Sequence, residues 1–140
     1  NGFVDDVIGW HFDAATGTAG NDPMDIHGHG THVSGTIGAV GNNNTGVVGV
    51  NWQVQIMALN VFHNTANGPR ATLVDMINAT KYAANNGAQV LNASLGAYYN
   101  APGSLISAMQ SFEDQGGMFI AASGNDGVNT DVYNHNPSRR

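Results

Sequence analysis

The sequence predicts an α/β protein of three layers, with helices on both faces of a mostly parallel sheet. Short apolar stretches alternate along the chain with segments whose apolar residues recur at helical spacing, and the links between them are short. Such alternation favours parallel strands joined by crossover helices. Residues 118–122 are apolar throughout, which is typical of a buried strand covered on both faces.

The first half of the chain contains two predicted strands and one predicted helix. Residues 7–12 and 54–61 are mostly apolar and short, as strands are. Between them, residues 29–40 carry apolar side chains at helical spacing. Residues 63–69 are rich in turn-forming residues.

The second half contains two predicted helices and two predicted strands. Residues 71–86 have the clearest helical pattern, and Gly87 follows where a helix-ending glycine is expected. Residues 104–115 form a second amphipathic helix. Residues 90–94 and 118–122 are the predicted strands of this half.

Composition excludes several classes of protein. The chain has 140 residues, of which 41% are apolar and 10% charged, so one domain or part of one is expected. A net charge of -6 excludes the basic surface that nucleic-acid binding needs. No apolar run is long enough to cross a bilayer. The absence of cysteine excludes disulfides and thiolate metal sites.

Three histidines at the start of the first predicted helix are the most informative feature. His27, His29 and His32 lie within six residues and alternate with Gly28 and Gly30. They could be plain helix-entry residues. They could instead bind zinc through their imidazoles. A third reading is a general base, because imidazole titrates near neutrality and the small neighbours leave room for a substrate.

Three ordered motifs resemble those of the subtilases, the subtilisin-like serine peptidases. The first is the histidine signature, which reads His29-Gly30-Thr31-His32-Val33-Ser34-Gly35-Thr36. Residues 92–96 resemble the strand that lines the primary specificity pocket, and residues 122–127 resemble the turn with the oxyanion asparagine. Residues 1–10 are similar to an acidic insertion of some secreted bacterial members.

The resemblance implies an incomplete subtilisin-like fold and a peptide or protein substrate. It implies that His29 is the general base and that Asn125 donates to the oxyanion. An extended substrate would pair with the backbone of Ser94, Leu95 and Gly96. A wall of the primary pocket would be formed by Ala122, Ser123 and Gly124.

Two motifs of the family are missing from this sequence. No Asp-Ser-Gly or Asp-Thr-Gly motif supplies an orienting carboxylate, and no Gly-Thr-Ser-Met-Ala-like motif supplies the nucleophile. We therefore expect residues 1–140 to be the central segment of a single peptidase domain, inactive alone. Two alternatives remain open: a zinc hydrolase that uses His27, His29 and His32, and a truncated homologue that only binds peptides.

The resemblance requires no cofactor for the chemistry but suggests structural calcium. The loop after the histidine helix is similar to a calcium loop of the family, with Asn42, Asn44 and Val47 as ligands. Asp5 and Asp6 could belong to a second calcium loop. The resemblance also implies a secreted protein, whereas the sequence gives no indication of oligomeric state.

Overall fold

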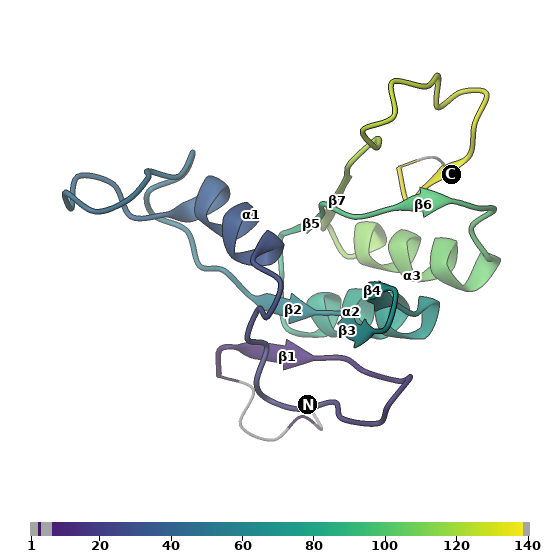
Figure 1. Ribbon diagram of the computed structural model, residues 1–140, viewed down its shortest axis with the longest axis horizontal. Coiled ribbons are helices and arrows are strands. Elements are labelled where there is room, and N and C mark those ends of the chain that lie inside the picture. Colours follow the sequence, from purple (N-terminus) through teal and green to yellow (C-terminus); the bar gives the residue numbers. More distant parts are fainter. Residues whose placement is uncertain (1–2, 4–6, 139–140) are drawn as a thin grey trace. The chain divides into compact units, whose positions relative to one another are not determined.

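The computed structural model describes residue 3 and residues 7–138. The chain forms two compact units, residues 1–72 and residues 73–140, which we describe separately. The acidic pair Asp5 and Asp6, with its predicted calcium loop, lies outside the described residues, as do residues 1–2 and 4 of the predicted insertion at residues 1–10. Each unit has a pair of parallel strands, accompanied by a helix in the first unit and by two helices in the second, which confirms the α/β class (Figure 1).

The first unit is built around a parallel strand pair. Strand β1 (Gly9–His11) pairs with β2 (Ala58–Asn60), and helix α1 (His29–Gly38) lies between them in the sequence. The predicted elements are therefore present but shorter. The second predicted strand, residues 54–61, is regular only from Ala58 to Asn60.

Gly9 allows the backbone of β1 to lie very close to the backbone of β2. A side chain on Gly9 would place its Cβ 2.0 Å from the Ala58 carbonyl oxygen, and Gly9 has a φ of 131°. Only glycine fits such a position. Phe12 and Val61, which follow the two strands, are buried apolar residues of this unit.

The turn-rich stretch at residues 63–69 contains the turn of a β-hairpin, whose two strands were not predicted. Strand β3 (Phe62–Thr65) pairs antiparallel with β4 (Gly68–Ala71). Turn-forming residues marked only its tip, where the Thr65 hydroxyl donates to the Gly68 carbonyl at 2.6 Å. Gly68 has a φ of 94°, which a tight turn between strands requires.

The second unit contains two helices and two strand pairs. Helices α2 (Leu73–Asn85) and α3 (Gly103–Asp114) agree with the predicted helices within two residues at each end. Strands β5 (Val90–Ala93) and β7 (Met118–Ala121) pair in parallel, as predicted. Strands β6 (Ala97–Tyr98) and β8 (His135–Asn136) were not predicted, and they pair antiparallel.

The core of the second unit lies where α2 and α3 pack together (Figure 1). Leu105, Met109 and Phe112 of α3 are each only 1% exposed. Gly117 lies against the Phe112 ring, since a Cβ there would come within 2.5 Å of it. Leu105, Met109 and Phe112 thus form the buried face that the helical pattern predicted.

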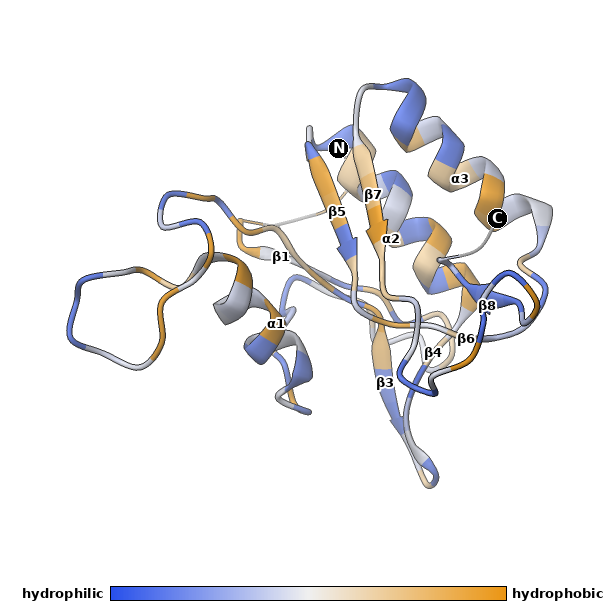
Figure 2. Ribbon diagram, turned by 90° about the horizontal axis from the view of Figure 1, so that it is seen from above, coloured by the Kyte–Doolittle hydropathy of each residue, from blue (hydrophilic) through white to orange (hydrophobic). Residues whose placement is uncertain are grey.

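Within the second unit, helices cover only one face of the β5–β7 pair. Figure 2 shows α2 and α3 on one side of the pair. Side chains of a strand alternate between faces, and Val90, Met118 and Ile120 on the other face are 59%, 58% and 45% exposed. The apolar run at residues 118–122 therefore has one side that the helices of the second unit cover and one side that they leave exposed.

Among the helices of the described residues, none has the length and apolar character needed to cross a membrane.

Candidate functional site

Helix α1 begins at His29, directly after a glycine in the left-handed conformation. Gly28 has a φ of 92° and has no side chain with which to cap the helix. The His29 ring is exposed, and no group in the described residues forms a hydrogen bond with it. The His27 ring lies next to it, with 6.5 Å between the ring centroids. The His29 ring is therefore open to solvent.

Asp25 supplies the cap that Gly28 lacks. Its carboxylate accepts hydrogen bonds from the backbone N–H groups of His27, Gly28 and Thr31, at 2.8, 2.8 and 2.7 Å. The backbone bond from Thr31, followed by those from Gly28 and His27, holds the pKa of Asp25 well below its usual range. Sequence reasoning missed this role, although an acidic residue just before a helix start could have indicated it.

The zinc alternative receives no support from this geometry. Zinc needs three or four ligand atoms at about 2.0–2.3 Å from one point. Within residue 3 and residues 7–138, no three His, Asp or Glu side chains gather closely enough to hold a metal ion. His27, His29 and His32 follow one another along the chain without forming such a group.

The two predicted substrate-binding segments emerge side by side in the second unit. Ser94 follows β5 and Ala122 follows β7, and the Ala122 N–H donates to the Ala93 carbonyl at 3.1 Å. Both segments therefore leave the carboxyl ends of adjacent parallel strands, where α/β sheets bind ligands. Leu95 is half-buried, and Gly96 is exposed.

His135 lies between these two segments, and sequence reasoning missed it. The side chain is 4% exposed. A Cβ on Gly96 would come within 2.4 Å of the His135 ring, and a Cβ on Gly124 within 2.9 Å. His135 also lies opposite Tyr98 in the antiparallel β6–β8 pair. No periodicity marks a strand of two residues, so the sequence offered no signal for this contact.

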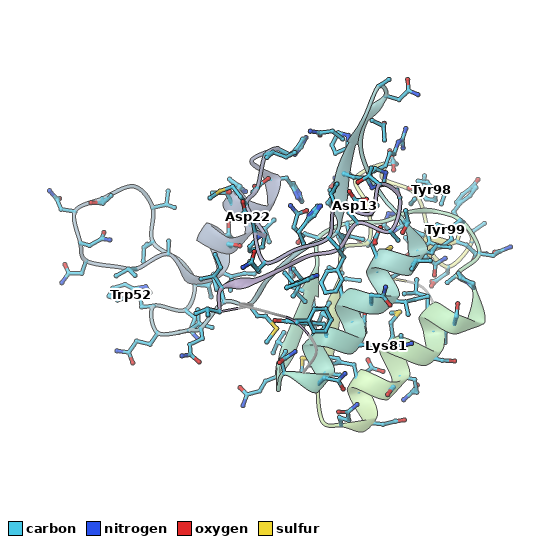
Figure 3. The ribbon with its side chains drawn as sticks, turned by 90° about the horizontal axis from the view of Figure 1, so that it is seen from below. Asp13, Asp22, Trp52, Lys81, Tyr98 and Tyr99 are labelled. Atoms are coloured by element: carbon cyan, nitrogen blue, oxygen red, sulfur yellow. The ribbon has the colours of Figure 1, made fainter. Side chains whose placement is uncertain are left out.

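Asn125 follows the second segment with its side chain exposed. In the described part of the chain, the Asn125 amide has no hydrogen-bond partner, so both of its N–H groups are available. The neighbouring Asp126 is engaged, because it accepts a hydrogen bond from the Tyr98 hydroxyl at 2.7 Å. That hydrogen bond raises the pKa of Tyr98. Figure 3 labels Tyr98 next to Tyr99.

The predicted calcium loop forms a hollow of about 310 Å³ lined by residues 40–48. Asn42 and Asn44 both have a φ of 56°, in the left-handed region. The side chain of Asn43 is engaged within the loop, where it accepts from the Thr45 N–H at 3.1 Å. Within the described residues, the Asn42 and Asn44 amides have no partner, so their oxygens remain free. Residues 40–48 contain no carboxylate.

A buried acidic residue lies just beyond β1. Asp13 is 4% exposed and accepts from the Thr16 N–H at 2.9 Å, from the Thr16 hydroxyl, and from the Thr18 hydroxyl at 2.7 Å. The side-chain bond from Thr16 is the main cause that holds the pKa of Asp13 well below its usual range. His11 and His63 approach the carboxylate at 3.8 and 4.0 Å.

These features define an α/β protein whose exposed polar groups lie at a helix start and beyond the carboxyl ends of parallel strands. Sites at strand ends are typical of α/β enzymes. The chain belongs to the subtilase family, because the family model described as "Subtilase family" matches residues 3–139. This match confirms the resemblance seen in the sequence.

Individual relatives agree with this assignment. Thermitase of Thermoactinomyces vulgaris is 36% identical over 127 residues, which are 91% of this chain and 43% of thermitase. A thermophilic serine proteinase of Bacillus sp. (strain AK1) is 38% identical over 109 residues, 78% of this chain and 26% of the relative. The chain thus spans less than half the length of these relatives.

A solved structure supports the incomplete subtilisin-like fold. The structure of an S41 psychrophilic protease superimposes with a TM-score of 0.73 and 29% sequence identity. The superposition covers 86% of this chain and 39% of that protease.

Proposed function

We propose that this chain is the central segment of a single subtilisin-like serine endopeptidase domain, with His29 as general base and Asn125 as oxyanion donor. The observation that carries the proposal is the family match, which extends from residue 3 to residue 139 and includes both residues. Two further facts support it. The His29 ring is exposed and unbonded at a helix start, and the Asn125 amide is exposed without a partner in the described residues.

The proposed chemistry assigns one proton transfer and one charge interaction to this chain. A serine hydroxyl from another segment attacks the peptide carbonyl, and His29 takes the hydroxyl proton and then gives it to the leaving amine. The Asn125 amide donates to the oxygen that becomes negative. In subtilisin, removal of such a side-chain donor lowers kcat about 10²–10³-fold, a magnitude that belongs to that enzyme.

The substrate is proposed to be a peptide or protein that binds in extended form. Ser94, Leu95 and Gly96 would offer backbone groups to the substrate, as an added strand requires. Residues 122–124 would form one wall of the primary pocket. The adjacent positions of the two segments at the ends of β5 and β7 support this arrangement.

The isolated chain is proposed to be inactive. Its sequence has neither the serine motif nor the aspartate motif of the family, and no carboxylate of the described residues bonds to the His29 ring. An imidazole without an orienting carboxylate and without a nucleophile cannot complete the acyl transfer.

A fluorophosphonate that labels activated serines tests this proposal. We expect no labelled serine in the 140-residue chain, and labelling in the product of the complete reading frame if that frame supplies both missing motifs. There, His29→Ala should abolish labelling, whereas the matched His27→Asn change should leave it. Labelling of a serine in the isolated chain, or labelling that survives His29→Ala, would contradict the assignment. A complete frame without the serine motif would favour a protein that only binds peptides.

We further propose a structural calcium ion in the loop after α1 and secretion of the whole protein. The free amide oxygens of Asn42 and Asn44 and the carbonyl of Val47 are hard oxygen donors, which calcium prefers. They fit calcium only in part, because the loop lacks a carboxylate. Calcium would hold the loop and take no part in the chemistry. Secretion rests on the family resemblance alone.

A further inference from the structure

We propose that Asp25 is a positioning residue for His29: one carboxylate binds the chain on both sides of His29 and thereby fixes how the imidazole leaves the helix start. This inference rests on the proposed role of His29 as general base. Asp25 does not belong to an Asp-Ser-Gly or Asp-Thr-Gly motif, so it is not the orienting carboxylate of the family.

The four hydrogen bonds of Asp25 enclose His29. Oδ1 accepts from the N–H groups of His27 and Gly28, both at 2.8 Å. Oδ2 accepts from the Thr31 N–H at 2.7 Å and from the Thr31 hydroxyl at 2.8 Å. One oxygen therefore holds the two residues before His29, and the other holds the residue two positions after it.

The local backbone needs such an anchor. His29 stands between Gly28 and Gly30, and glycine has more conformational freedom than any other residue. Thr31 is the third residue of α1, and its N–H is one of those that a capping side chain ordinarily satisfies. Gly28 cannot satisfy it, so Asp25 does so from three residues further back.

An ionised carboxylate suits this position better than a neutral group. Only a carboxylate can accept all four bonds, because an amide has one acceptor oxygen. Negative charge is also favourable at a helix N-terminus. A general base must reach the proton it abstracts within hydrogen-bond distance, and a displacement of about 1 Å can cost about 100-fold in rate. Holding the backbone around His29 is therefore a direct contribution to its function.

Amide exchange and the ring signals of His29 in the 140-residue chain test the inference by NMR. Asp25→Asn retains a single, neutral acceptor oxygen, which cannot serve both sides at once, and Asp25→Ala should lose all four bonds. In both variants the Thr31 amide should exchange about tenfold faster or more, as loss of a bond to a charged acceptor predicts. The His29 ring signals should shift toward those of a mobile histidine.

Asp22→Asn is the matched control, since Asp22 lies three residues earlier and accepts a bond from the Met24 N–H at 3.0 Å. It removes the same charge and should change neither readout. The Phe12 N–H, bonded to Asn60 at 2.8 Å, reports whether the first unit remains folded. Unchanged Thr31 exchange and His29 signals in folded Asp25→Ala, or equal changes in Asp22→Asn, would overturn the inference.

Kinetics of the complete reading-frame product separate this inference from the proposed function. Asp25→Asn should lower kcat about 10–100-fold with little change in KM, because a displaced base affects the chemical step. A raised KM at unchanged kcat would count against the positioning role. If the unaltered product hydrolyses no peptide, the proposed function fails, while the exchange experiment still decides whether Asp25 holds the His29 segment.

Discussion

At the scale of single residues, hydrogen-bond donors surround the buried carboxylate of Asp13 in the first unit. Asp13 receives three hydrogen bonds from Thr16 and Thr18 and has two imidazoles within 4.0 Å. Nδ1 of His63 is buried and has no hydrogen-bond partner in the described residues. A buried carboxylate is tolerated only when such donors replace water.

Acid should weaken the first unit through Asp13. Its pKa is lower in the folded chain than the ordinary value of about 3.9, so its stabilising effect is complete above that value and is lost as the pH falls below it. We expect the urea midpoint of the first unit, followed by Trp10 fluorescence, to drop below about pH 4. Asp13→Asn should flatten this drop, whereas Asp22→Asn should not. The same acid dependence in Asp13→Asn as in the unaltered chain would refute the role of Asp13.

A second contact at this scale concerns the segments proposed to bind substrate. Gly96 and Gly124 leave room for the His135 ring, and Gly124 has a φ of 89° besides. The ring is also fixed from the other side, because His135 Nδ1 lies 3.1 Å from the Ser138 hydroxyl oxygen. The spacing of the two segments therefore depends on a residue remote from both in the sequence.

Gly96→Ala should destabilise the second unit by about 1–3 kcal/mol, since its Cβ would meet the His135 ring at 2.4 Å and the Asn136 carbonyl oxygen at 2.7 Å. Hydrogen exchange of the Ala122 amide measures the loss. Gly103→Ala is the control, because no atom lies within 4 Å of its Cβ. Adding His135→Ala to Gly96→Ala should recover part of the loss. A Gly96→Ala chain as stable as Gly103→Ala would disprove the contact.

At the scale of elements, backbone hydrogen bonds join the end of helix α1 to the segment that follows its loop. Backbone N–H groups of Gly49, Val50 and Asn51 return to the carbonyls of Ala39, Thr36 and Ile37 at 2.8–2.9 Å. Carbonyls that a helix end leaves free are thereby satisfied. The ring of Trp52, labelled in Figure 3, lies against Gly41, since a Cβ on Gly41 would come within 2.6 Å of it. The loop is thus held at its base while residues 42–48 remain exposed.

Calcium should bind this loop weakly and be detectable through Trp52 fluorescence. Neutral oxygens alone make a low-affinity site, so we expect a Kd on the order of 10⁻³ M. Asn42→Ala and Asn44→Ala should each reduce the calcium response. Asn78→Ala, an exposed asparagine on α2, should leave it unchanged. A response that persists in both loop variants, or no response to calcium at all, would exclude the proposed ligands.

At the scale of the whole molecule, the chain is shorter than the proteins it resembles. It spans 43% of thermitase and 39% of the S41 psychrophilic protease. The open face of β5–β7 exposes large apolar side chains that a complete layered fold would cover, among them Val90 and Met118. Exposed apolar surface of this kind weakens cooperative folding.

The isolated chain should therefore melt broadly and bind a hydrophobic dye. Far-UV circular dichroism should show a transition without a sharp midpoint, and a longer product that adds covering layers should melt cooperatively with less dye bound. In the longer product, the backbone amides of β5 and β7 should also exchange more slowly than in the 140-residue chain. A sharp, two-state melt of the 140-residue chain would contradict this expectation.

Local pattern was sufficient for much of this protein. The spacing of apolar residues predicted α2 and α3 within two residues, and the order of strands and helices predicted the parallel pairing of β5 with β7. The histidine signature and the asparagine turn led to the subtilase family, which the family match confirms. The roles of His29 and Asn125 remain predictions.

Tertiary structure alone decided the rest. Periodicity needs several residues, so the two-residue strands β6 and β8 and the contacts of His135 left no trace in the sequence. The hydrogen bonds of Asp13 and Asp25 depend on the path of the backbone, and the open face of β5–β7 depends on which layers are present. A sequence determines the pattern that each segment offers, whereas burial and hydrogen bonding depend on what the fold brings next to it.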